Sequence, residues 1–220
     1  IAAWFYWRAG ETESRLRMAN RLVRVHAIML THALILLLYY FLADRFQYDY
    51  VTHNSSRDQA LFYKISALWA GQEGTFLLWA WMAALMLLFV IRRRGELLRV
   101  TMLYLLATQM FLLILLFVRS PFAQVPDGVV PADGNGLNPL LKDPWMVIHP
   151  PVVFIGYAAF AIPFCYTLAA LTLKRYASLA ATIFPWVAFA VTTLGAGIFI
   201  GGFWAYKVLG WGGYWGWDPV

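Results

Sequence analysis

Five long runs without any Asp, Glu, Lys or Arg constrain the fold of this sequence more than any other feature. An α-helix needs roughly 20 apolar residues to cross about 30 Å of hydrocarbon, and each run is long enough to do so. The runs lack a regular alternation of polar and apolar residues, so they predict helices rather than the strands of a barrel. The predicted membrane helices cover residues 25–43, 74–91, 100–118, 152–173 and 182–203.

The composition excludes several other classes of protein. With 62% hydrophobic and 13% charged residues, the chain has too little polar surface for a soluble enzyme or a disordered protein. The net charge of +6 does not indicate nucleic-acid binding, because the basic residues lie in short clusters between the apolar runs. We expect an all-α polytopic bundle, a single membrane domain over residues 1–220 of a truncated chain. Five complete membrane helices follow residues 1–7, the expected end of a cut helix.

The charged residues predict the orientation in the membrane. Basic residues accumulate on the cytoplasmic side of membrane proteins. One side of the predicted bundle carries eleven Lys and Arg residues against three acidic ones, and the other carries six against eight. The basic side, formed by residues 8–24, 92–99 and 174–175, is therefore expected to be cytoplasmic.

The connections on the opposite, outer side are long. The predicted outer loops, residues 44–73 and 119–148, are rich in Asn, Pro, Gly and aromatic residues. Long connecting segments commonly carry function, so we expect the functional surface on the outer side. Cys165 lies within an apolar run, which predicts a small buried side chain without thiol chemistry.

Tryptophan and glycine are concentrated in residues 204–220. Trp204, Trp211, Trp215 and Trp217 are interleaved there with Gly and Tyr. Such a segment is typical either of the aromatic belt at a membrane interface or of a flat apolar wall that holds a large planar ligand. The residue pattern alone leaves both interpretations open.

Three stretches resemble one known family. Residues 211–220 read WGGYWGWDPV, which resembles the tryptophan-rich WWD signature of heme-handling proteins and, in its last residues, the cytochrome c maturation protein F branch (CcmF/NrfE). Residues 134–151 (GNGLNPLLKDPWMVIHPP) and 54–79 (NSSRDQALFYKISALWAGQEGTFLLW) resemble the same family in the same order. Two positions depart from it: Tyr214 stands where the branch often has Trp, and Gln72 where it often has His.

The resemblance implies a membrane heme lyase subunit of cytochrome c biogenesis. Heme, b-type and handled as substrate, would arrive on the outer face from a CcmE-like chaperone and be attached to an apocytochrome c, with a CcmH-type thiol partner. The protein would lie in the bacterial inner membrane, and a second intramembrane heme b would be held by histidines beyond these 220 residues. The implied heme-binding residues are His149, Trp204, Trp211, Gly212, Tyr214, Trp215, Trp217 and Asp218.

His149 is the preferred candidate for an axial ligand of the heme iron. Neutral imidazole is a common heme ligand, and His149 stands directly before Pro150 and Pro151. Because a residue before proline favours extended backbone, the sequence predicts His149 at a fixed position just outside helix 152–173. The tryptophan segment is expected on the same side of the membrane, and the family has its outer axial histidine in this motif.

The other ionisable candidates are weaker. His53 lies in a polar part of an outer loop and is the fallback ligand. Glu73 stands at the start of a predicted helix, where the helix dipole favours a carboxylate, and the resemblance leaves a binding role open. His26 and His32 lie six residues apart within one predicted helix, so they do not share a face.

A function of another class stays open on these observations. A polytopic transporter or scaffold subunit without heme chemistry would account for histidines within a span, a kink at Pro163 and a glycine-rich last helix. That function would follow a path through the bundle, whereas heme handling would concentrate on the outer surface.

Overall fold

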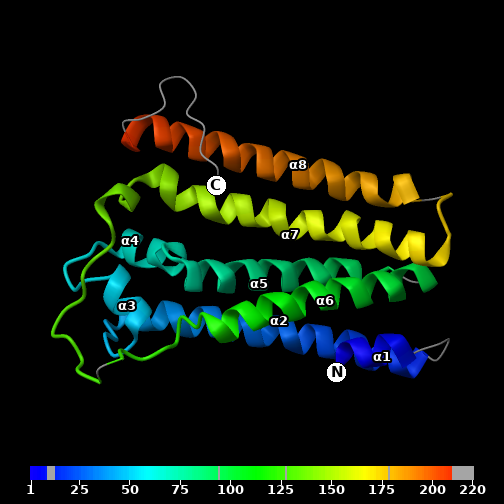
Figure 1. The fold of residues 1–220 in the computed structure, drawn as a ribbon, viewed down its shortest axis with the longest axis horizontal. Helices are drawn as coiled ribbons and strands as arrows, with labels where there is room; N and C mark the ends of the chain where they lie inside the picture. The colour runs from blue at the N-terminus through cyan, green and yellow to red at the C-terminus, as the bar shows by residue number, and fades with distance from the viewer. Residues whose placement is uncertain (9–12, 94, 127, 178, 210–220) are drawn as a thin grey trace.

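The fold is a bundle of long helices, seen in a computed structural model that describes residues 1–8, 13–93, 95–126, 128–177 and 179–209. The long helices lie side by side, and their connections gather at the two ends of the bundle (Figure 1). The long helices are α2 (Glu13–Leu42), α5 (Gln72–Val90), α6 (Glu96–Val118), α7 (Pro144–Leu173) and α8 (Leu179–Trp204).

The predicted all-α membrane fold is confirmed. Each of the five long helices is apolar and long enough to cross a membrane. In the described part of the chain β-structure is confined to an isolated bridge between Tyr48 and Gln124. A short helix, α1 (Ala2–Arg8), precedes α2 and packs against α2 and α6, and a π-helical turn, η3 (Ala205–Leu209), continues α8.

Two helices begin well before the uncharged runs that predicted them. α2 starts at Glu13, because basic residues that lie in water do not interrupt helical hydrogen bonding. α7 starts at Pro144, where the Asp143 side chain accepts a hydrogen bond from the Trp145 backbone N–H at 2.9 Å. A capping Asp followed by Pro at the first position is a strong helix start, and it lies eight residues before the predicted one.

The two expected outer loops form a layer over one end of the bundle. The first contains α3 (Asp49–Asn54), α4 (Leu61–Ser66) and the 3-10 turn η1 (Ala67–Trp69), and the second contains the 3-10 turn η2 (Pro139–Leu141). Backbone hydrogen bonds join them, among them Asn135 N–H to Thr52 O at 2.7 Å. Gly134 lies so close to the Ser55 carbonyl that a Cβ would overlap with it. The loops are therefore a packed cap, drawn at the left in Figure 1.

α8 differs from the other long helices because it packs almost entirely on α7. Its buried residues are Ala190 and Gly197. A Cβ at Gly197 would lie 2.6 Å from Val153 Cγ2, and one at Gly156 would lie 2.7 Å from Leu194 Cβ. Small residues let the two backbones approach closely, as in other membrane helix pairs.

Candidate functional site

His149 lies inside α7 and not in front of it, which corrects the predicted extended position. The helix starts at Asp143 and Pro144, so His149 occupies its second turn, and Pro150 and Pro151 are helical as well. In an α-helix Pro151 cannot donate to the carbonyl of Val147 four residues earlier, which leaves that acceptor free. The indole N–H of Trp69 donates to this carbonyl oxygen at 3.1 Å. Trp69 therefore replaces the hydrogen bond that Pro151 cannot make.

The His149 ring is held against α8. Its Nδ1 lies 2.8 Å from the carbonyl oxygen of Gly197. Because that oxygen can only accept, Nδ1 carries a proton, and Nε2 is the nitrogen with the lone pair when the ring is neutral. The ring also lies on Gly201, where a Cβ would be 2.6 Å from Nδ1. A neutral imidazole oriented by an Nδ1–H to carbonyl bond is the form in which histidine binds metals through Nε2.

Trp204 lies at the same end of the bundle as His149. It is the last residue of α8, three positions after Gly201, and its indole N–H donates to the Leu140 carbonyl at 3.2 Å. Phe203 beside it makes an edge contact with Trp145, with ring centroids 5.1 Å apart. The other predicted wall residues lie outside the described residues: Trp211, Gly212, Tyr214, Trp215, Trp217 and Asp218.

An ion pair joins the start of α7 to the turn η3, next to these aromatic residues. Lys207 Nζ, in η3, lies 3.1 Å from Asp143 Oδ2, and Asp143 is 8% exposed. The same carboxylate caps the start of α7 through its other oxygen. One side chain therefore ties the start of α7, six residues before His149, to the segment that leads into the tryptophan-rich sequence.

The two weaker candidates have local partners. His53 is exposed in α3, where its Nδ1 contacts the Asp49 backbone carbonyl at 2.9 Å and the Asp49 carboxylate at 3.3 Å. Glu73 lies in the first turn of α5, as a dipole-favoured carboxylate should, and its Oε1 is 3.8 Å from Arg119 NH1. Among the described contacts, none joins either residue to His149.

The histidines of α2 do not form a site with His149. His32 is exposed and bonds to the Ile28 carbonyl of its own helix at 2.8 Å. His26 Nε2 contacts the Gln109 side chain at 3.1 Å. Over the described ranges no group of three His, Cys, Asp or Glu residues could hold a metal ion by itself. His149 is therefore not part of a metal site formed by described protein side chains alone.

Two residues of this end were missed by the sequence analysis. Trp69 lies in the stretch 54–79 that carried the family resemblance, but its role depends on a contact with α7. Tyr50, in α3, donates its hydroxyl hydrogen to the Ala67 carbonyl at 3.1 Å and accepts from the Gly71 N–H at 3.0 Å. Burial raises the pKa of the Tyr50 hydroxyl, so the phenol stays neutral. Tyr50 thereby holds the turn that presents Trp69.

Comparison with known proteins decides the family. The profile of the family described as "Cytochrome C assembly protein" matches residues 69–220. The chain belongs to this family. The CcmF protein of Pseudomonas aeruginosa is 40% identical over 82% of this chain and 28% of its own length, and that of Escherichia coli K12 is 33% identical over 100% and 35%. NrfE of Haemophilus influenzae is 37% identical over 84% of this chain and 30% of its own.

The fold agrees with the family assignment. A solved structure of the cytochrome c heme lyase CcmF matches with a TM-score of 0.84 and 28% identity, over 99% of this chain and 35% of that one. The predicted CcmF/NrfE family is therefore confirmed, and the protein is a multi-pass membrane protein of cytochrome c biogenesis. The chain spans about a third of the length of these family members.

Proposed function

We propose that this chain forms the heme-receiving part of a heme lyase subunit, at the end of the bundle that carries His149. The observation that supports this most is the His149 ring, which Gly197 orients at the same end as Trp204 and which makes no hydrogen bond through Nε2 among the described contacts. Relatives named CcmF and heme lyase give the substrate class. Heme would be a substrate that the protein holds and passes on.

The chain's own residues would bind and orient the substrate. His149 Nε2 would supply one axial bond, and the hydrogen bond from Nδ1–H to Gly197 would keep the imidazole in the correct tautomer. Trp204, together with Trp211, Gly212, Tyr214, Trp215, Trp217 and Asp218, would form the wall against which a flat macrocycle packs. Lys207, paired with Asp143, would hold the start of this wall.

The covalent chemistry would belong to the partners. Cys165 is fully buried between helices, so it cannot reach a heme vinyl group at the end of the bundle. The thiols would come from an apocytochrome c, kept reduced by a CcmH-type partner, after a CcmE-like chaperone delivers heme. The catalytic contribution of this chain is then positioning. The surface would face the outer side of the bacterial inner membrane, opposite the basic connections.

Replacement of His149 tests the proposal. The His149→Ala variant of the full-length protein, purified in detergent, should bind hemin at least about tenfold more weakly at one site, because an axial bond is lost. Titration followed by Soret absorbance measures the affinity and the number of sites. His53→Ala is the matched control, since His53 is an exposed histidine at the same end. Hemin binding by His149→Ala with wild-type affinity and stoichiometry would remove His149 from the site.

A further inference from the structure

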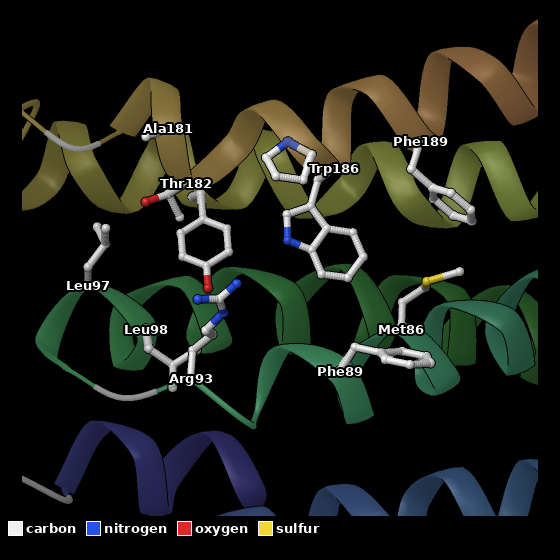
Figure 2. A pocket seen from close by; sticks show the side chains of 11 residues that line it. Met86, Phe89, Arg93, Leu97, Leu98, Ala181, Thr182, Trp186 and Phe189 are labelled. Carbon is white, nitrogen blue, oxygen red and sulfur yellow. The ribbon is translucent and has the colours of Figure 1, made fainter.

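A large cavity lies near the opposite end of the bundle, away from His149. Its volume is about 840 Å³, and it is lined by the end of α5, the connection to α6, the start of α6, α7 and the first half of α8 (Figure 2). Apolar side chains form most of the wall, chiefly Met86, Phe89, Leu97, Trp186 and Phe189. A cavity of this kind fits hydrocarbon chains or aromatic groups.

Among the described residues that line this cavity, Arg93 is the one with a positively charged side chain. Arg93 lies in the connection between α5 and α6, and its side chain points into the space below Thr182 and Trp186 (Figure 2). Glu96, the acidic residue next in the chain, is paired with Arg175 at 2.8 Å. Among the ion pairs of the described residues none includes Arg93, and its guanidinium interacts electrostatically with Tyr166, which also lines the cavity. A guanidinium without a carboxylate partner can bind an anion.

The position of the cavity in the bundle indicates what kind of anion Arg93 would bind. The cavity lies at the basic end, where α5 has crossed its apolar length and the chain turns back into α6. That is the depth of the lipid headgroups on the side predicted to be cytoplasmic. A guanidinium beside an apolar cavity at this depth matches an amphiphile with an anionic head and acyl chains, and basic pockets between membrane helices bind acidic lipids in this way.

We propose that this cavity binds an acidic phospholipid, with the phosphate on Arg93 and the acyl chains between α5 and α8. A porphyrin also carries negative groups on an apolar body, but none of the described histidines lines the cavity.

Lipid retention measures the proposed binding directly. The full-length protein is incubated in detergent with equal amounts of phosphatidylglycerol and phosphatidylethanolamine, and retained lipid is counted by native mass spectrometry. The wild type should prefer phosphatidylglycerol, and Arg93→Gln should lower that preference about fivefold, the effect of one basic residue near a headgroup. Arg93→Lys should keep most of it, because the positive charge remains.

Two further variants separate this site from general effects. Arg21→Gln removes the same charge from an exposed position of α2, on the other side of the bundle, and should retain lipid like the wild type. Ala181→Phe should reduce retention without changing charge, since Ala181 lines the cavity. The proposal is overturned if the wild type shows no preference, if Arg93→Gln retains it, or if Arg21→Gln loses it equally.

Discussion

At the scale of single residues, the site depends on how α7 tolerates two consecutive prolines. A proline inside a helix removes one backbone hydrogen bond and exposes a carbonyl group. Trp69 satisfies the carbonyl of Val147, two residues before His149. The indole thus supports the turn from which the imidazole projects, although Trp69 is far from His149 in the sequence.

The Trp69→Phe variant should remove the hydrogen bond to Val147 while keeping an aromatic side chain at position 69. A smaller phenyl ring replaces the indole, the N–H is lost, and the Val147 carbonyl loses its donor, which should cost about 1 kcal/mol of stability beyond the lost packing. Hemin affinity of the full-length protein should fall, because the start of α7 is less well held. Trp79→Phe is the control, since the described contacts of Trp79 are ring contacts with Phe154 and Tyr157. Equal hemin affinities for the two variants would show that the Trp69 hydrogen bond has no positioning role.

At the scale of secondary-structure elements, the contact between α7 and α8 brings the candidate ligand and the tryptophan segment together. Gly197 contributes its carbonyl to His149, and Gly201 provides the flat surface under the ring. Because α8 is packed on α7 and on little else, its position depends on these small residues. The two glycines therefore serve both the packing of α8 on α7 and the placement of the His149 ring.

Gly201→Ala should disturb this contact, whereas Gly202→Ala should not. A methyl group at Gly201 would overlap with the His149 ring, at a cost of about 1–3 kcal/mol or a displaced imidazole. At Gly202 a Cβ has no neighbour within 4 Å, so alanine should be neutral or slightly stabilising. Thermal unfolding in detergent and hemin titration of both variants measure the difference. Similar behaviour of the two alanine variants would contradict the proposed seat of the ring.

At the scale of the whole molecule, the two ends of the bundle are different. One end is capped by the packed layer of α3, α4, η1 and η2 and carries His149 and Trp204. The other end has short basic connections, the ion pair between Arg175 and Glu96, and the cavity beside Arg93. The charge distribution predicts that the basic end is cytoplasmic.

Cysteine labelling in intact cells tests this orientation. Native Cys165 is fully buried and should react little with a membrane-impermeant maleimide. Ala60→Cys, in the exposed outer layer, should be labelled in cells whose outer membrane has been permeabilised. Ala177→Cys, exposed in the connection between α7 and α8, should be labelled only after the inner membrane is opened. The reverse pattern would contradict the assigned orientation and place His149 on the cytoplasmic side.

The sequence by itself determined the five membrane helices, the difference in charge between their ends and the family. These follow from local properties, because apolar length, charge and motif spelling are properties of neighbouring residues. The sequence also identified His149 as a candidate heme ligand, because two prolines follow it as in the family motif.

The tertiary structure decided where that histidine lies and what holds it. The hydrogen bond from Trp69 to Val147 and the contacts of His149 with Gly197 and Gly201 each join segments that are far apart in the chain. Arg93 likewise lines a cavity only because the first half of α8, far away in the sequence, lies opposite the end of α5 and the start of α6. Such contacts depend on how whole helices pack. Local residue preferences therefore do not predict that Trp69 donates to the Val147 carbonyl, or that Arg93 lines a cavity.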